Sequence, residues 1–556
     1  MRVAFYAVLL PLGIACAASP PASTGAGGTM DSAGGGASGQ GGAAVTGTVT
    51  IEINSANSVH PISPLIYGLN TTGDIATTKQ TVVRKGGNRW TAYNWENNAS
   101  NAGKDWLYQN DGYLAQGTTN PDAPGEAVRE ALQTTHANGA AALLTVPNVD
   151  YVAADKLGGG DVRNSGADYL QTRFKQNQAK KGADFTLTPD PNDATVYQDE
   201  FVNWVKTNFS DGPVLFDLDN EPDLWGPATN THPEVHPDAV TYVELVERNS
   251  RFAGAIKDTW PDAKVLGFVS YGWDGFVSLQ KAPDASGKGE FVDYYLNAMK
   301  TQSDAAGHRL IDYLDLHWYP EATGGADANG NGGTRITLAS TTDVVVEARV
   351  QAPRSLWDEA YKEVSWITQW STKGPIRLIP RMKEKIAANY PDTQLAFTEW
   401  NYGGGTHISG ALASADVLGI FGREGVGLAC NWDVGAPETF THAAFLVYRN
   451  FDGAGGHFGD TSIAAVTSDV EASSVYASLD SAAPDSLVIV AINKRTYPLD
   501  ATIKITHTAS YSQASVFTLT SSAAAVNAAP GLTASTANQF VYTMPAQSVS
   551  VIVLKL

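Results

Sequence analysis

The chain has 556 residues, of which 43% are apolar and 13 are Trp, and its formal net charge is −20 at pH 7. This length and composition predict a globular protein with more than one domain and exclude a disordered chain. The acidic balance argues against nucleic-acid binding, which needs clustered basic residues. The only cysteines are Cys16 and Cys430, so a disulfide framework is excluded.

The N-terminal residues are typical of an export signal. Arg2 precedes an apolar segment, residues 3–15, that is too short to span a bilayer, and small residues follow it. We therefore expect residues 1–18 to be a signal peptide and the protein to be secreted. Cys16 ends a stretch that resembles a lipoprotein cleavage box. The sequence thus leaves open a surface tether through a lipidated Cys16, with the protein peripheral to the membrane.

Residues 19–47 are rich in Gly, Ser and Ala and predict a flexible linker. The pattern then changes, because Val49, Ile51 and Ile53 alternate with polar residues and indicate a half-buried strand. No similar strand follows nearby. We therefore expect residues 48–64 to contribute this strand to a distant sheet, that of a C-terminal β-sandwich.

Residues 65–455 alternate apolar strands with helical patterns and predict a (β/α)8 catalytic barrel with inserted loops. The candidate strands are residues 65–69, 81–86, 141–146, 214–218, 264–269, 313–317, 394–398 and 427–432. An open doubly wound sheet is the alternative. It would need a glycine-rich phosphate turn after an early strand, which this sequence lacks.

Residues 456–556 carry short alternating runs dominated by Val, Thr, Ser and Ala, with few long helical windows. This pattern predicts a small all-β sandwich. The predicted fold class is therefore α/β, a (β/α)8 TIM barrel plus a small all-β sandwich domain. Because the sandwich strands show no stripe of Trp, we favour a bracing role over glycan binding.

Two predicted barrel strands end in the same kind of sequence. Strand 214–218 leads to Glu221, strand 394–398 leads to Glu399, and an Asn and a Trp lie near each. Carboxylates at the C-terminal ends of two barrel strands can face each other across a cleft, as glycosidic cleavage requires. Glu221 is the candidate acid/base, because Pro222 and Trp225 lower the local polarity. Glu399 is the candidate nucleophile, and the alternative for either is an ion pair in a loop.

Side chains near these strand ends are candidates for substrate binding, since sugar rings stack on aromatic faces and polar groups hydrogen-bond sugar hydroxyls. The candidates are Asn220, Trp225, His317, Tyr319, Trp400 and Trp432. Trp400 and Trp432 are preferred for stacking because they flank a predicted strand end. For each Trp a place in the core is the alternative, and for His317 a structural hydrogen bond to backbone.

The predicted chemistry requires no cofactor, and the sequence assigns no metal ligand. The segment from His232 to His236 reads HPEVH, which lacks the spacing of the zinc-protease helix motif, so a loop is preferred. Residues 327–332 match the first half of a calcium loop, but Leu338 stands where the full motif has Glu. A structural calcium there is one expectation, and an ordinary polar turn is the alternative.

Four motifs in chain order resemble glycoside hydrolase family 44. They are GGNRWTAYNWENN at residues 86–98, DNEPDLW at 219–225, LHWYP at 316–320 and FTEWNY at 397–402. The resemblance covers about residues 48–556 and implies a barrel with a β-sandwich and retaining endo-hydrolysis of β-1,4-glucans, including xyloglucan. It also implies an acid/base at Glu221 and a nucleophile at Glu399. Trp400 stands where the family commonly has Tyr.

Together these observations predict a secreted endo-β-1,4-glucanase that hydrolyses cellulose-type β-glucans and xyloglucan by a retaining double displacement with two Glu. We expect a monomer whose partner is the β-1,4-glucan and not a nucleic acid. Another barrel β-glycanase, a xylanase or a mannanase, is the first alternative. A non-catalytic polysaccharide-binding surface protein is the second, although it would not need both carboxylates.

Overall fold

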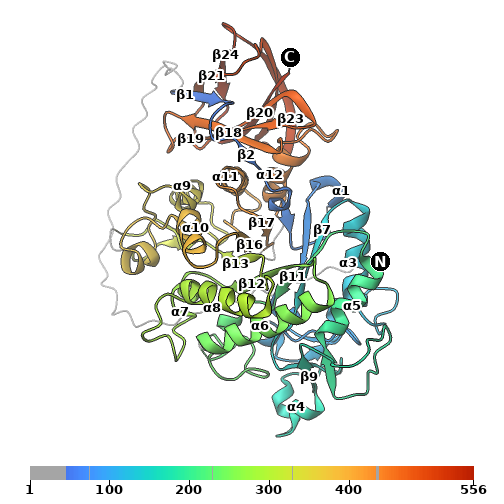
Figure 1. The fold of residues 1–556 in the computed structure, drawn as a ribbon. Helices are drawn as coiled ribbons and strands as arrows, with labels where there is room; N and C mark the ends of the chain where they lie inside the picture. Colours follow the sequence, from blue (N-terminus) through green and yellow to red (C-terminus); the bar gives the residue numbers. More distant parts are fainter. Residues whose placement is uncertain (1–45, 74, 228, 328–329, 434–437, 556) are drawn as a thin grey trace, which may run out of the picture. The chain divides into compact units, whose positions relative to one another are not determined.

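The computed structural model describes residues 46–73, 75–227, 229–327, 330–433 and 438–555. Gly47–Leu556 form one compact unit, coloured from blue to red in Figure 1. The predicted signal peptide, nearly all of the predicted linker and Cys16 lie outside the described residues. None of the helices in these ranges is long and apolar enough to cross a membrane.

Eight parallel strands close into a barrel, which confirms the predicted fold class (Figure 1). In order around the barrel they are β3 (Gly68–Leu69), β4 (Val82–Lys85), β7 (Ala141–Val146), β11 (Val214–Leu218), β12 (Lys264–Ser270), β13 (Tyr313–Trp318), β16 (Gln394–Trp400) and β17 (Leu428–Asn431). Each lies within or overlaps one of the eight strands expected from the sequence. Their C-terminal ends therefore meet at one face, where barrel enzymes carry their reactive groups.

The barrel interior is a packed core and not a pore. Along β7, Ala141 and Leu143 belong to the inner apolar cluster, whereas Ala142 and Leu144 belong to the cluster beneath the surrounding helices. This alternation follows from the two-residue repeat of a strand. Cys430 is buried in the inner cluster as a free thiol, as expected for a small apolar side chain.

Helices follow the strands and cover the outside of the barrel (Figure 1). They are α3 (Glu126–Ala137), α5 (Gln198–Phe209), α6 (Tyr242–Thr259), α8 (Phe291–Ala306), α9 (Asp343–Gln351), α10 (Leu378–Asn389), α11 (Ile408–Glu424) and α12 (Thr439–Arg449). The start of α6 is fixed by a capping box, in which the Thr241 side chain and the Glu244 side chain bond each other's backbone N–H.

Residues 358–372 have a helical sequence pattern, but they do not form the helix that this pattern indicates. This segment is irregular and contains only the short turn η7 (Ile367–Ser371). The Asp358 carboxylate accepts from the backbone N–H of Ala360, and the Thr368 hydroxyl donates to the carbonyl of Glu363. Such local side-chain bonds compete with a helical ladder.

The C-terminal strands form a sheet that folds over on itself into a sandwich. Their order is β23 (Ala523–Thr533), β22 (Gln513–Thr520), β25 (Ser548–Lys555), β20 (Ala483–Asn493), β19 (Ser473–Asp480), β18 (Thr461–Thr467), β1 (Gly47–Asn54), β21 (Leu499–Thr506) and β24 (Gln539–Met544). The N-terminal strand β1 is parallel to β21 and antiparallel to β18. Side chains such as Ile51, Ile503 and Leu487 pack into one core between the two halves.

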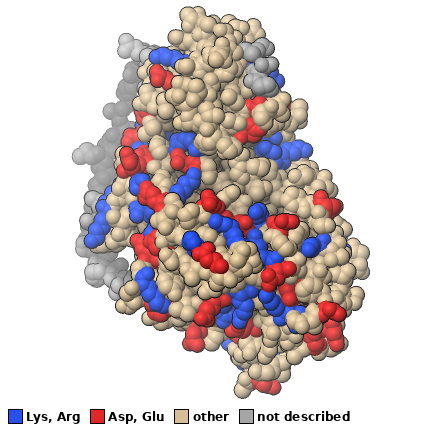
Figure 2. All heavy atoms as spheres, viewed as in Figure 1, with Lys and Arg blue, Asp and Glu red and all other residues tan. Residues whose placement is uncertain are grey.

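Charged side chains gather over the barrel on the face drawn in Figure 2 and are sparse over the sandwich at the top of that view. Acidic and basic side chains are interspersed on this face, so it carries no basic stripe of the kind that binds a nucleic-acid backbone.

A buried ion pair joins the barrel to the sandwich. Asp416 of α11 lies 2.9 Å from the ammonium of Lys494, which follows β20, and neither side chain is more than 2% exposed. Tyr476 of β19 donates its hydroxyl to the other Asp416 oxygen at 2.5 Å. Gly419 on the same helix allows this close approach, because a Cβ there would lie 2.2 Å from the Tyr476 ring.

Replacing Lys494 by Met should lower the free energy of unfolding by about 3–5 kcal/mol, because the Asp416 carboxylate would remain buried without its cation. Chemical denaturation followed by tryptophan fluorescence measures this change. The matched control is Lys504→Met, which removes one partner of the exposed Lys504–Glu52 pair and should change stability by less than about 1 kcal/mol. Equal effects of the two substitutions would contradict the prediction.

Candidate active site

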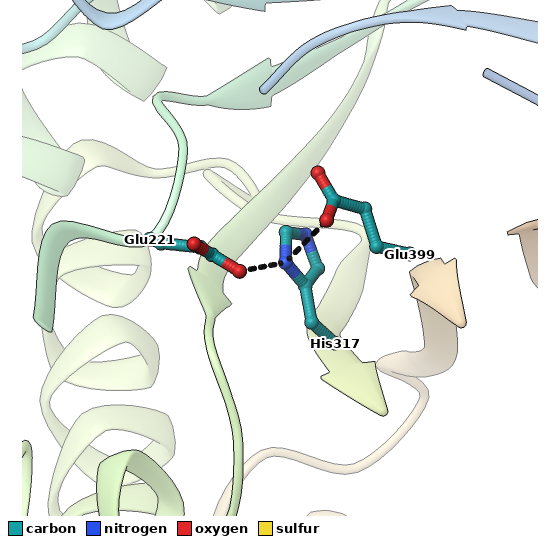
Figure 3. Close-up of side chains that lie close together, drawn as sticks. All are labelled: Glu221, His317 and Glu399. Carbon is teal, nitrogen blue, oxygen red and sulfur yellow. Dashed lines mark hydrogen bonds and ion pairs between the residues drawn. The ribbon is translucent and has the colours of Figure 1, made fainter. Parts of the chain in front are cut away.

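Two carboxylates meet at the C-terminal face of the barrel. Glu221 follows β11, Glu399 lies in β16, and His317 of β13 stands between them (Figure 3). The His317 Nδ1 atom is 2.8 Å from Glu221 Oε1 and 3.4 Å from Glu399 Oε2. One ligand atom from each of the three residues lies within 4.8 Å of the others. At this spacing both carboxyl groups can act on the same bond of a substrate.

The backbone that carries Glu221 is strained. Asp219 has φ 68° and Glu221 has φ 43°, both in the left-handed region that disfavours residues with a Cβ. Each such residue costs about 1–3 kcal/mol and persists only when its surroundings hold it. The Asp219 carboxylate accepts from the N–H of Asn148 at 2.6 Å, and the N–H of Glu221 donates to the carbonyl of Val269 at 3.0 Å. These bonds fix the direction of the Glu221 side chain.

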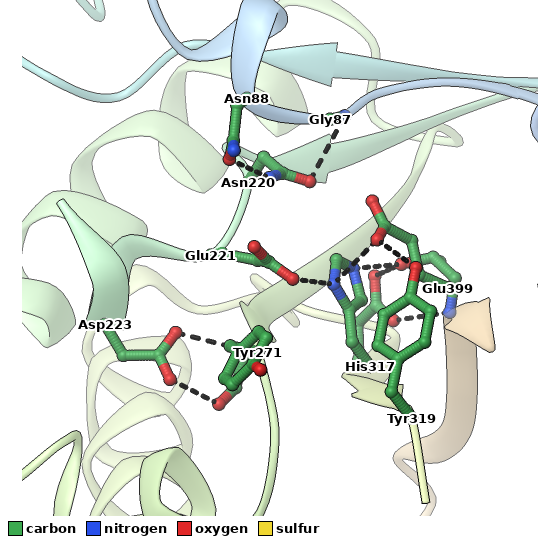
Figure 4. A network of polar contacts seen from close by, with 12 residues as sticks. Gly87, Asn88, Asn220, Glu221, Asp223, Tyr271, His317, Tyr319 and Glu399 are labelled. Atoms are coloured by element: carbon green, nitrogen blue, oxygen red, sulfur yellow. Dashed lines mark hydrogen bonds and ion pairs between the residues drawn. The ribbon is translucent and has the colours of Figure 1, made fainter. Parts of the chain in front are cut away.

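The side-chain oxygen of Asn220 accepts two hydrogen bonds from the protein. Its Oδ1 accepts from Arg84 at 2.9 Å and from the N–H of Gly87 at 3.2 Å, and its Nδ2 donates to Asn88 Oδ1 at 3.1 Å (Figure 4). An amide nitrogen has two N–H groups, so one remains for a ligand. Trp225 holds the same residue from behind, because its Nε1 donates to the Asn220 carbonyl at 3.2 Å.

Arg84 of β4 connects most of the site and was not expected from the sequence. Its completely buried guanidinium donates to Asp217 Oδ2 at 2.6 Å and to Glu399 Oε1 at 2.7 Å, as well as to Asn220. Burial lowers the pKa of Arg84, but the carboxylates of Asp217, Glu399 and Asp315 raise it by more, so the group stays charged. A fixed fork of this kind holds a carboxylate in place and favours its ionised form.

Replacing Arg84 by Met should lower the free energy of unfolding by about 3–5 kcal/mol, because Asp217 and Glu399 would lose their buried cation. The pKa of Glu399 should rise further, since Arg84 now opposes the effect of burial on that group. The acidic limb of the pH dependence of kcat/KM should therefore move to higher pH, as measured with an aryl β-cellobioside.

The control for this prediction is Arg84→Lys, which keeps one charge but loses the three-way fork. It should be less unstable than Arg84→Met and should shift the acidic limb by a smaller amount. An unshifted acidic limb in Arg84→Met would show that Arg84 does not act on Glu399.

The hydrogen bonds of His317 define which ring nitrogen carries a proton. The Thr398 hydroxyl donates to Asp315 Oδ2 at 2.8 Å, so it accepts from His317 Nε2 at 3.2 Å. Burial and the nearby Arg84 lower the pKa of His317 well below its ordinary value, and the ring is neutral. When Nε2 carries the single ring proton, Nδ1 is an acceptor, and the 2.8 Å contact with Glu221 is a hydrogen bond if the Glu221 carboxyl is protonated.

The environments of the two carboxyl groups differ accordingly. Burial, together with the neighbouring Glu399 and Asp223 carboxylates, raises the pKa of Glu221 well above its ordinary value. Burial also raises the pKa of Glu399, but the Arg84 charge and the Tyr319 hydroxyl, which donates to Oε2 at 2.8 Å, oppose that effect. A pair of carboxyl groups whose environments favour opposite protonation states is suited to separate acid and nucleophile roles.

The aromatic candidates separate into two groups. Trp225 and Trp400 are completely buried, so the expectation that they stack on a sugar is wrong. Trp400 instead packs against Phe421 and Phe445 beneath the helices. Trp432 is only partly buried and lies over Gly87, where a Cβ would come within 2.6 Å of its ring.

Tyr319 is also only partly buried and borders a small cavity of about 90 Å³. The walls of this cavity combine aromatic rings with charged groups, including those of Tyr271, Trp273, Trp366, Glu321 and Arg335. Arg335 donates to the carbonyl oxygens of Tyr319 at 2.7 Å and Pro320 at 2.9 Å. Aromatic faces beside charged hydrogen-bonding groups are the usual surroundings of a bound sugar.

The metal expectations concern other segments. Both ring nitrogens of His232 and of His236 contact protein oxygens, so neither ring offers a free nitrogen to zinc. The Asp327 carboxylate accepts from the N–H of Asn331 at 2.8 Å. Residues 328 and 329 of the expected calcium loop lie outside the described part of the chain. Within that part, the group suited to a metal is Glu221, His317 and Glu399 themselves.

Comparison with known proteins identifies the family. The profile of glycoside hydrolase family 44 matches residues 99–322. Over 528 residues the chain is 39% identical to endoglucanase A of Paenibacillus lautus, an overlap that covers 92% of this chain and 73% of that protein. The chain belongs to glycoside hydrolase family 44. The resemblance carried by the four sequence motifs is thereby confirmed, and the protein is a glycoside hydrolase.

Other relatives match this chain in structure or in sequence. The family-44 xyloglucanase of Paenibacillus polymyxa matches with a TM-score of 0.86 and 39% identity, covering 92% of this chain and 100% of that chain. A bifunctional glucanase–xylanase from a metagenome library matches with a TM-score of 0.76 and 29% identity, again over 92% and 100%. The β-mannanase/endoglucanase A of Caldicellulosiruptor saccharolyticus is 41% identical over 84% of this chain, which spans 36% of that longer protein.

Proposed function

We propose that this family-44 hydrolase is an endo-β-1,4-glucanase that cleaves cellulose-type β-glucans and xyloglucan with retention of configuration. The observation that carries the proposal is the separation of the two carboxyl groups, whose oxygens approach within 4.8 Å. Retaining enzymes hold their carboxyl groups about 5–5.5 Å apart, whereas inverting enzymes need about 6.5–9.5 Å to admit a water between them. The names of the relatives support the choice of glucan.

In the first step Glu221 gives its proton to the leaving glycosidic oxygen as Glu399 attacks the anomeric carbon. The C–O bond breaks, and a glycosyl ester forms on Glu399. In the second step Glu221, now ionised, takes a proton from water as the water oxygen attacks the same carbon and releases Glu399. Two inversions give a product with the original β configuration. Arg84 and Tyr319 hold Glu399 in its attacking position through the hydrogen bonds they donate to it.

Two measurements test this proposal. Carboxymethyl-cellulose and xyloglucan should lose viscosity faster than reducing ends accumulate, which is the sign of internal cleavage. Proton NMR of the first products should show the β anomer before it equilibrates. If the first products are the α anomer, the enzyme inverts configuration and the double-displacement mechanism is ruled out. If short oligosaccharides are released only from chain ends, the enzyme is not an endo-glucanase.

A second candidate is a β-glycanase of broader or different specificity. It is favoured by the similarity to the glucanase–xylanase and to the β-mannanase/endoglucanase. Relative kcat/KM values on xyloglucan, cellulosic polymer, xylan and mannan distinguish the two candidates. A preference for xylan or mannan would favour the second.

We also propose that the protein is exported and acts as a monomer. The apolar residues 3–15 and the small residues after them support export. Mass spectrometry of the protein isolated from its native host would locate the mature N-terminus and show whether Cys16 carries lipid. Light scattering gives the molar mass in solution, and a value near 58.8 kDa or somewhat below it, after loss of a leader, supports a monomer.

A further inference from the structure

The HPEVH segment supports the active site from behind. His232 is completely buried, with Nδ1 2.9 Å from Glu234 Oε1 and Nε2 2.9 Å from the carbonyl oxygen of Asn88. Both ring nitrogens face oxygen atoms, and only a doubly protonated ring can donate to both. Burial lowers the pKa of His232, but the Glu234 carboxylate raises it by more, so that the pKa lies above its ordinary value.

His232 thereby holds the residue that orients Asn220. The backbone of Asn88 accepts from His232, and its side-chain Nδ2 donates to Asp105 Oδ2 at 2.7 Å. Asn88 Oδ1 is consequently turned toward Asn220 and accepts one of its two N–H groups (Figure 4). Because the amide group is planar, fixing one N–H also fixes the direction of the other.

His236 acts on the backbone of Asn220 through Trp225. Its ring lies 5.4 Å from that of Trp225, and its Nδ1 and Nε2 bind the Asp238 carbonyl and Glu244 Oε1, each at 2.8 Å. Trp225 in turn donates to the Asn220 carbonyl. The two histidines therefore hold the side chain and the backbone of Asn220, each through one intervening residue.

We propose that His232 and His236 are positioning residues for Asn220, which aim its second N–H at the sugar 2-hydroxyl beside the reacting carbon. This inference rests on the proposed glycosidase function. A hydrogen bond to the 2-hydroxyl strengthens as the transition state forms, and a displacement of about 1 Å can reduce the rate about 100-fold. The segment between the strand end and α6 thus contributes to catalysis without touching the substrate.

The test is a double-mutant cycle on an aryl β-cellobioside. His232→Gln loses one of the two donors, because a Gln amide cannot donate at both former ring positions. It should lower kcat about 10–100-fold and leave KM within about twofold. In an Asn220→Ala background the same substitution should have almost no further effect, since the group that it positions is gone. The matched control is His136→Gln, which replaces a largely buried histidine at the end of α3 and should leave kcat unchanged.

Additive losses in the cycle, or an unchanged kcat for His232→Gln, would overturn the inference. If His232→Gln does not fold, as judged by its circular dichroism and melting temperature, the cycle is repeated with Glu234→Gln, which weakens the hold on the same ring. If Glu234→Gln lowers kcat as much in the Asn220→Ala background as in the wild type, the positioning role is rejected. If the wild type is active and the Glu221 and Glu399 variants are inactive, the proposed function is supported whatever the double-mutant cycle shows. No cleavage by the wild type would overturn both.

Discussion

Replacing Glu399 by Gln is expected to lower kcat/KM on xyloglucan by at least about 10⁴-fold, because the amide cannot form the glycosyl ester. The fold should persist. A Gln oxygen can still accept from Arg84, and Arg84 keeps its 2.6 Å contact with Asp217. Reducing-sugar release gives the rate, and an unchanged melting temperature separates lost chemistry from lost structure.

The role of Glu399 is tested further with Glu399→Gly, an aryl β-cellobioside carrying a good leaving group, and added azide. The anion should enter the space of the missing carboxylate, form a C–N bond from that side and expel the phenolate. The product is then the α-glycosyl azide. Isolation of the β-glycosyl azide would instead reassign Glu399 as the acid/base.

Replacing Glu221 by Ala is expected to lower kcat/KM on xyloglucan by about 10²–10⁴-fold, the usual contribution of a general acid. The loss should depend on the leaving group. A dinitrophenyl β-cellobioside needs no proton to depart, so its glycosylation step should be nearly unaffected and the glycosyl-enzyme should accumulate as a burst. An equal loss on both substrates would contradict the assignment of Glu221 as the acid.

The pH dependence follows from the same assignment. The wild type needs Glu399 ionised and Glu221 protonated, so kcat/KM should fall at low pH with Glu399 and at high pH with Glu221. Because burial and the neighbouring carboxylates raise the pKa of Glu221, the alkaline limb should lie well above the ordinary range of a carboxyl group. Glu221→Ala should abolish this limb for the dinitrophenyl substrate and keep the acidic one.

Much of the fold was predictable because buried parallel strands have a distinctive sequence pattern. The strand before Glu221 and the strand that carries Glu399 contain continuous apolar runs, and their polar C-terminal ends indicate the catalytic face. The burial of Trp400 could also have been predicted from the sequence. Glu399 and Trp400 are consecutive in one strand, so their side chains point to opposite faces. When Glu399 faces the cleft, Trp400 must face the helices.

The role of Arg84 in the active site was harder to predict, although the sequence contains one indication of it. An arginine inside an otherwise apolar strand is rarely buried without partners, and here β4 reads Val-Val-Arg-Lys. Its partners Asp217 and Glu399 are 133 and 315 residues away, and no local pattern connects them. Hydrogen-bond networks across a barrel depend on the order of strands around it, which the sequence of one strand does not contain.

The insertion of β1 between β18 and β21 has a consequence for biosynthesis. Ser55 bonds the carbonyl of Thr506, 451 residues later. At about 5–20 residues per second, roughly 20–90 s of synthesis separate this first strand from its partner. During that time the apolar side chains of β1 have no sheet to join, and such an open strand is prone to pair with other chains. The sandwich can therefore close only after the whole barrel has been made, and truncation before β21 should leave β1 unpaired and make the protein prone to aggregate.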